Sequence, residues 1–93
     1  MNDIEYKRSV DSLYKWAVEV FQHASGDTSI RIALCTYLRR GRREGFAQGE
    51  LIDFLGVSSP SVLDAAGYDS SRSNTAMQIL ASMTDEEIEE AKE

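Results

Sequence analysis

The sequence predicts an all-α fold, a compact bundle of five or six helices with an N-terminal helical hairpin and a helix-turn-helix-like corner. Apolar residues recur every three or four positions, as they do on the buried face of a helix. Glycines and short polar residues, which end and begin helices, separate these stretches. No stretch alternates long enough to predict a strand. The 93 residues suffice for one small domain, so we expect residues 1–93 to form a single helical domain.

The first predicted helix begins at Asn2 or Asp3 and ends near Ser25, because Gly26 suits the left-handed turn after a helix end. Lysines, arginines and acidic residues occupy its outer side. Its buried face is predicted from the spacing of six apolar residues, Val10, Leu13, Ala17, Val20, Phe21 and Ala24.

The second predicted helix runs from about Thr28 to Arg40 and is ended by Gly41. Asp27 or Thr28 can accept hydrogen bonds from its first free N–H groups. Because the helix is so apolar, we expect it to lie at the centre of the core and to form a hairpin with the first helix. Its apolar stripe comprises Ile30, Ala33, Leu34, Tyr37 and Leu38, and Ile32 and Cys35 extend it.

Shorter helices are predicted in the second half of the chain. The third runs from Ala47 to Leu55 and is ended by Gly56. Ser58 is expected to cap the fourth, with Pro60 in its first turn, where a missing N–H has little cost.

Gly67 closes the fourth helix, and a fifth is predicted near Ser71 to Met83. Thr84 and Glu87 have capping-box spacing, so a sixth, acidic helix is expected over about 84–93, reaching Lys92 and frayed at its end.

The composition restricts the classes of protein to consider. The formal net charge is −6, and no apolar run approaches the roughly 18–20 residues that span a bilayer, so no membrane helix is expected. Asp3 and Glu5 near the N-terminus argue against a signal peptide. Cys35 is the only cysteine, which excludes an internal disulfide and favours a reducing compartment, the cytoplasm.

The stretch from Gln48 to Val62, "QGELIDFLGVSSPSV", resembles the helix-turn-helix of bacterial transcription regulators. In that pattern Leu51 and Leu55 are buried and Gly56 makes the turn. Val57 anchors this turn, and Val62 is the packing residue of the second helix. The resemblance implies a second helix that enters the major groove of DNA. The residues that would contact DNA are Gln48, Ser58, Ser59 and Ser61.

Two features of this stretch depart from the pattern. Ile52 stands where a small residue usually lets the two helices approach. The second helix also has no Arg or Lys, and Asp64 would repel phosphate, whereas DNA binding depends largely on basic residues that release counterions. DNA could be read only if the upstream arginines held its backbone nearby.

A second resemblance covers more of the chain. The succession of helices around Gly26, Asp27 and Thr28, the pair Tyr37–Leu38, Phe46 and Leu51 is similar to that of small proteins carried on bacterial plasmids and phages. It implies an origin on a mobile element. Many short acidic proteins of that origin bind and block a host protein.

Opposite charges and aromatic residues supply the candidate partner-binding sites. Four arginines, Arg39, Arg40, Arg42 and Arg43, lie within five positions, and guanidinium groups pair with carboxylate or phosphate in a fork. In the acidic tail, Glu86, Glu87 and Glu90 could dock on a basic surface. Trp16 and Tyr6 lie off the main apolar stripe, where they either contact a partner or pack under the tail; of the two, Trp16 is the candidate.

No enzyme is expected, and no catalytic, cofactor-binding or metal-binding residue is proposed. His23 has no nucleophile at a supporting spacing, and it is expected to interact with a helix end. Cys35 is expected to be a buried structural thiol. One histidine and one cysteine do not make a zinc set, and "GRREGFAQG" lacks the ending of a phosphate-binding loop.

The favoured function is therefore a small, acidic, non-enzymatic protein that inhibits or regulates a macromolecular partner. The partner is expected to be a host protein, and the chain is expected to come from a phage or another mobile element. The alternative is a helix-turn-helix transcription regulator that reads a two-fold DNA site as a homodimer. The two alternatives differ in one geometric requirement, because DNA binding needs the arginine cluster and the 58–62 segment on one exposed face.

Overall fold

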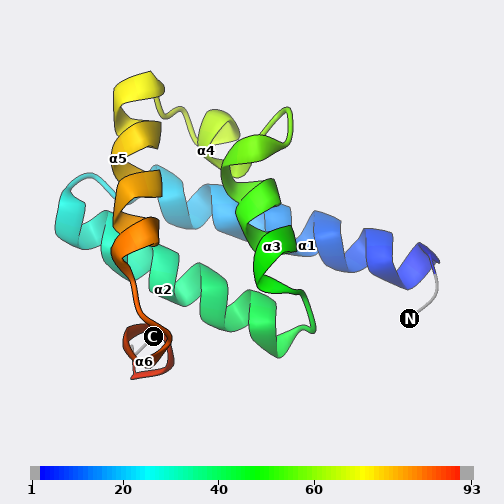
Figure 1. The fold of residues 1–93 in the computed structure, drawn as a ribbon. Coiled ribbons are helices and arrows are strands. Elements are labelled where there is room, and N and C mark those ends of the chain that lie inside the picture. The colour runs from blue at the N-terminus through cyan, green and yellow to red at the C-terminus, as the bar shows by residue number, and fades with distance from the viewer. Residues whose placement is uncertain (1–2, 91–93) are drawn as a thin grey trace.

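The computed structural model describes residues 3–90, and these residues contain helices and no strand (Figure 1). The all-α prediction is confirmed. A single π-helical segment, η1, continues α3 directly. The elements in chain order are α1 (Asp3–Gln22), α2 (Asp27–Arg43), α3 (Gln48–Ile52), η1 (Asp53–Val57), α4 (Val62–Ala65), α5 (Ser70–Ser82) and α6 (Asp85–Glu90). Within this range no helix is both long enough and apolar enough to cross a bilayer.

The helices α1 and α2 form the N-terminal hairpin that the sequence predicts (Figure 1). The turn between them differs from the expectation in one respect. Gly26 has a φ of −130°, which is extended backbone and not the left-handed turn of a helix end. It precedes α2, whose Ile30 N–H donates to the Gly26 carbonyl at 2.8 Å.

Gly41 does not end the second helix, as the sequence suggested, but lies inside it. It is buried, and a Cβ there would meet the side chain of Leu51 from α3, with Cδ1 only 2.7 Å away. The absence of a side chain therefore lets α3 pack closely on α2. The helix continues to Arg43, and the turn is made by Gly45, which has a φ of +95°.

The predicted third helix also extends past its expected end. Gly56 lies within η1, and the helix continues to Val57, which is 68% exposed and so anchors nothing. Ser61, and not Ser58, caps α4: its Oγ accepts a hydrogen bond from the Asp64 N–H at 3.1 Å. Pro60 precedes α4, joined to Ser59 by a cis peptide bond, and does not lie in the first turn.

The last two helices lie across and beside α2 (Figure 1). Asp69 caps α5 by accepting from the Arg72 N–H at 2.8 Å. The predicted cap of α6 is present, since Thr84 Oγ1 accepts from the Glu87 N–H at 3.1 Å. The predicted extension to Lys92 falls on residues 91–93, which lie outside the described residues.

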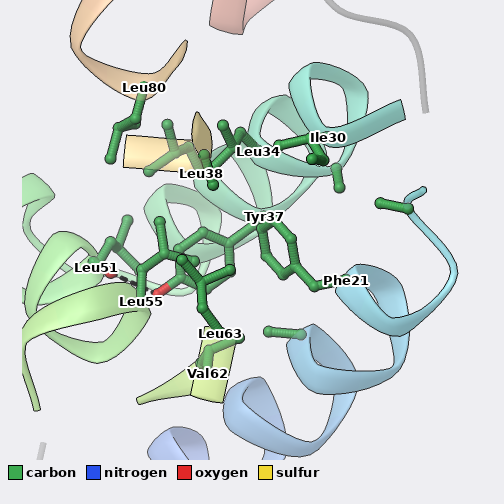
Figure 2. Close-up of a cluster of buried hydrophobic side chains, with 14 of the residues drawn as sticks. Phe21, Ile30, Leu34, Tyr37, Leu38, Leu51, Leu55, Val62, Leu63 and Leu80 are labelled. Carbon is green, nitrogen blue, oxygen red and sulfur yellow. Dashed lines mark hydrogen bonds between the residues drawn. The ribbon is translucent and has the colours of Figure 1, made fainter. Parts of the chain in front are cut away.

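Inward-facing residues of α2 form the centre of the core (Figure 2). Tyr37 is fully buried, and its hydroxyl donates to the Leu51 carbonyl at 2.6 Å, which ties α2 to α3. Its ring lies edge-on to Phe21 of α1, with centroids 5.9 Å apart. Burial raises the pKa of Tyr37 well above that of an exposed tyrosine. Because α2 contacts the helices around it, its inner face fixes the directions in which its outer residues point.

Candidate functional site

Three of the four predicted arginines, Arg39, Arg42 and Arg43, line one hollow, and Arg40 points away from it toward α1. Successive residues of a helix are rotated by about 100°, so neighbours in sequence face different elements. Arg42 faces α6, together with Arg31, which the sequence analysis did not single out. Arg40 faces α1. Arg39 and Arg43 lie beside the gap between α2 and the end of α6.

The flank of α2 that faces α6 is occupied by that helix. Arg31 Nη1 donates to Glu87 Oε1 at 2.9 Å. Arg42 donates at 2.9 Å to both Asp85 and Glu89, and these hydrogen bonds raise its pKa. Between these ion pairs, Ile88 is buried at 2% exposure. This arrangement of four α6 residues on two arginines is called the α6 flank below.

Two of the three predicted acidic residues in the tail can be placed. Glu87 belongs to the α6 flank and is thus already paired within the chain. Glu86 is exposed. The side chain of Glu90 lies outside the part of the chain that the structure describes.

An open hollow of about 330 Å³ lies at the C-terminal end of α2. Its lining residues are Arg39, Arg42, Arg43 and Glu89. Arg39 makes no hydrogen bond or ion pair with another residue in the range 3–90. Arg39 therefore offers guanidinium donors to an anionic group at this hollow.

The opposite flank of α2 faces α1 and contains an open hollow of about 200 Å³. Ile32 lies at this hollow with 57% of its surface exposed. This position corrects the prediction that Ile32 extends the buried stripe of the second helix. The lining is mainly apolar and comprises Val20, His23, Ala24, Ser29, Ile32, Ala33 and Thr36.

The two helices that border this hollow also bring Trp16 and Arg40 together. Trp16 lies one helical turn before Val20 on α1, and Arg40 lies one turn after Thr36 on α2. The Arg40 Cζ lies 4.5 Å from the centroid of the Trp16 ring, so the two side chains meet across the two helices. The surface formed by Trp16, Val20, Ile32, Thr36 and Arg40 is called the α1–α2 groove below.

Arg40 is held at its end of the groove by a second contact. Its Nε lies 3.7 Å from Glu44 Oε2, one turn further along the chain. Its guanidinium stacks on the Trp16 ring. Since 33% of the Arg40 side chain is still exposed, it can donate to a partner's carboxylate.

The aromatic residues that lie off the main stripe do not pack under α6. Trp16 is half-buried against Arg40, as described above. The Tyr6 hydroxyl donates to Glu50 Oε2 at 2.7 Å, and its ring lies edge-on to Phe46. This hydrogen bond raises the pKa of Tyr6 and lowers that of Glu50. Tyr6 thus joins α1 to the start of α3, and Trp16 alone belongs to the groove.

The four residues that the helix-turn-helix resemblance implies for DNA binding do not share one environment. Gln48 Oε1 accepts from Arg42 at 3.1 and 3.3 Å. Ser58 and Ser59 are exposed in the loop before α4. Ser61 is only 2% exposed and caps α4, so its side chain cannot reach a base edge, contrary to the expectation.

The corner also differs from a DNA-reading pair of helices in shape. The predicted buried positions, Leu51, Leu55 and Val62, are all fully buried. However, α4 has only four residues. The 58–61 loop and the end of α2 lie at opposite ends of α3 and η1, about 15 Å of helix (Figure 1). The arginines are therefore not beside Ser58 and Ser59.

The remaining candidate residues have ordinary structural surroundings. Cys35 is buried, and burial raises the pKa of its thiol, as does the negative charge of Glu87. His23 is exposed at the rim of the α1–α2 groove. Within residues 3–90, no group of three or more histidine, cysteine or acidic side chains has the arrangement of a metal site.

The sequence analysis missed Val20 and Ile32 as surface residues because both fit an apolar stripe. One signal could have identified Ile32: on a helical wheel it lies with the polar residues Ser29, Thr36 and Arg39, away from the other apolar residues of the helix.

No family model, curated protein or solved structure matches this chain. The function is therefore inferred from the geometry of its surfaces.

Proposed function

We propose that this chain is a non-enzymatic binding protein that inhibits or regulates a macromolecular partner, and that the partner is a protein. The observation that supports this proposal is the exposure of Ile32 at the apolar end of the α1–α2 groove. Trp16 and Arg40 lie at the other end of the same groove. A surface of this kind gains free energy when a partner covers it.

The composition of the groove favours protein over nucleic acid. Trp16 and Arg40 are of the residue types that dominate protein–protein binding energy, and the exposed Ile32 lies in the same groove. DNA instead selects for many exposed basic residues that follow its phosphates. The chain has a net charge of −6, and Ser61 is used internally as a helix cap. These features support a protein partner.

Three finer points remain predictions from the sequence. They are a host protein as the target, an origin on a phage or another mobile element, and the cytoplasm as the compartment. A homodimer is a further prediction, which sedimentation at several protein concentrations would test.

The proposed function can be tested with two matched variants. Ile32→Ser removes the exposed apolar side chain of the groove, and Val57→Ser makes the same kind of change at another exposed site on η1. Tagged full-length chains would be used to capture proteins from a nuclease-treated bacterial lysate. We expect one protein to be retained by the wild type and by Val57→Ser and to be lost with Ile32→Ser.

Two results would contradict this proposal. Retention of the same protein by Ile32→Ser would exclude the groove as the binding surface. If no protein survives nuclease treatment, while duplex DNA binds the chain at physiological salt, the transcription-regulator alternative would be favoured.

A further inference from the structure

We propose that the face of α2 beneath α6 is a second binding surface, which takes an acidic amphipathic helix of a partner protein in exchange for α6. This face lies on the other side of α2 from the α1–α2 groove, so it does not depend on the function proposed above. Three observations support it: which contacts hold α6, how few they are, and which arginine they leave unpaired.

The α6 flank shows what kind of helix this face of α2 binds. Ile88 is buried, and carboxylates lie on both sides of it, since Glu87 precedes it and Glu89 follows it. Glu87 pairs with Arg31, whereas Glu89 and the first residue of α6 pair with Arg42. The two arginines are eleven residues apart, which is about 16 Å along α2. This face therefore fits a helix with one apolar residue between carboxylates.

Few contacts hold α6 in this position. The helix has only six residues, whereas an isolated helix of fewer than about 12–15 residues is marginal in water. Ile88 is the only buried side chain among residues 85–89. The side chains of Asp85 and Glu89 remain 88% and 65% exposed, and ion pairs of such groups are weak and screened by salt. We therefore expect α6 to leave α2 and unfold while the other helices stay packed.

Release of α6 would uncover a stripe along α2. Its members are spaced by four, three and four residues, which places them on one face of the helix: Arg31, Cys35, Leu38 and Arg42. Burial raises the pKa of the Cys35 thiol, and so does the negative charge of Glu87, as expected for a thiol beneath α6. The stripe has a guanidinium at each end and apolar side chains between them.

Arg39 gives a partner's helix an advantage over α6. It borders the hollow beside Glu89 and makes no hydrogen bond or ion pair with another residue in the range 3–90. A longer acidic helix would keep the contacts of α6 and add a carboxylate at Arg39. A basic helix would meet these guanidinium groups with like charge, and a nucleic-acid backbone has no apolar side chain to replace Ile88.

The proposal can be tested with a labelled peptide and full-length chains. The fluorescein-labelled peptide has about 20 residues, long enough to form helix. It begins with the sequence of residues 84–93 and continues as an alanine-based helix that carries further glutamates. In the control peptides, alanine replaces the isoleucine, or glutamine or lysine replaces every acidic residue. Binding is measured by fluorescence anisotropy at about 0.15 M salt.

Two variants weaken the docking of α6 by different routes. Ile88→Ser removes its buried side chain, and Asp85→Asn/Glu89→Gln removes two ion pairs at exposed positions. Asp11→Asn/Glu19→Gln makes the same chemical change at exposed sites of α1 and is the matched control.

The affinity for a covered surface falls with the fraction of chains in which that surface is open. We therefore expect the peptide to bind Ile88→Ser at least about tenfold, and the acidic double variant roughly fivefold, more tightly than the wild type. The α1 control should bind it as the wild type does.

Cys35 provides a second readout at the site itself. Modification of its thiol by Ellman's reagent should be slow in the wild type, where Cys35 is 4% exposed, and at least about tenfold faster in Ile88→Ser. The bound peptide should restore slow modification, because it covers the thiol as α6 does.

Any of four results would overturn the proposal. They are equal affinity of the peptide for the wild type and the weakened variants, equal binding of a control peptide, peptide binding that leaves Cys35 reactive, and dimers of the variants in place of peptide binding. If Ile88→Ser does not fold, Asp85→Asn/Glu89→Gln decides by the same two readouts. These results do not involve Ile32, so the function proposed above is tested separately.

Discussion

The two flanks of α2 have similar patterns of residues and different surroundings. On the α6 flank, Arg31 and Arg42 are paired with carboxylates of α6, and Ile88 is buried between them. On the other side, Ile32 is largely exposed, and Arg40 meets only Trp16 and the nearby Glu44 among the described residues. One flank is therefore filled by the chain itself, and the other is open to a partner.

The difference teaches that a cluster of charge in the sequence is not the same as a free charged surface. Four arginines within five positions predict one basic patch, but Arg39, Arg42 and Arg43 line one hollow while Arg40 faces α1. Arg42 is neutralised by α6, whereas Arg40 forms one end of the groove. The acidic tail was predicted to bind a partner, but its Asp85, Glu87 and Glu89 pair with arginines of α2 in the same chain.

The largest expected difference between the flanks is in stability. Ile88→Ala should lower the free energy of unfolding by about 2–3 kcal/mol, because it removes buried methyl groups that hold α6 on α2. Ile32→Ala should change it by less than about 0.5 kcal/mol, since that side chain is exposed. Urea denaturation followed by circular dichroism measures both values. Equal losses of unfolding free energy for Ile88→Ala and Ile32→Ala would contradict the assignment of a filled flank and an open flank.

The inner face of α2 provides a reference for both flanks. Tyr37→Phe removes the hydroxyl that donates to the Leu51 carbonyl and should cost about 1–2 kcal/mol. Because the buried Tyr37 has a raised pKa, the unfolded chain loses this proton above about pH 10 and the folded chain keeps it. The stability of the wild type should therefore fall as the pH rises above 10.

Tyr37→Phe should reduce this alkaline loss without removing it, since burial also raises the pKa of Tyr68. Denaturation curves between pH 7 and pH 11 would measure the slope. An identical slope in the wild type and the variant would contradict the assignment to Tyr37.

A smaller effect is expected from the ion pairs of the α6 flank. Arg42→Gln should lower the free energy of unfolding by about 1 kcal/mol, because the pairs with Asp85 and Glu89 are partly exposed to solvent. Arg39→Gln changes an arginine of the same helix that makes no ion pair within residues 3–90, and it should have less than half of that effect. The difference in unfolding free energy between the two variants should become smaller in 1 M salt, because salt screens ion pairs. A larger loss of unfolding free energy for Arg39→Gln than for Arg42→Gln would contradict this expectation.

Much of the fold could be predicted from local signals in the sequence. The helical hairpin and the cap at Thr84 follow from spacing and capping chemistry, and the structure contains both. Gly41 and Gly56 were misjudged because a glycine can end a helix or admit a close neighbour. Only the tertiary contacts of Gly41 with Leu51, and of Gly56 with Met77, distinguish these two uses.

The candidate site was less predictable. Trp16 and Arg40 were identified by residue type, but their contact depends on how α1 and α2 pack. The sequence analysis ended the second helix at Gly41, so it did not recognise that Arg42 and Arg43 belong to the helix. A helix extended to Arg43 would have predicted that Arg42 lies with Arg31, and that Ile32 lies with Arg39 and Arg43.

The most direct measurement for the central claim is a map of backbone amide shifts in the ¹⁵N-labelled chain as the partner protein captured from the lysate is added. We predict that the largest changes lie along the groove, at Val20, Ile32, Thr36 and Arg40, while the amides of α6 change little. If the largest changes instead lie in α6 or in the 58–61 loop, the α1–α2 groove is not the open flank at which this protein binds its partner.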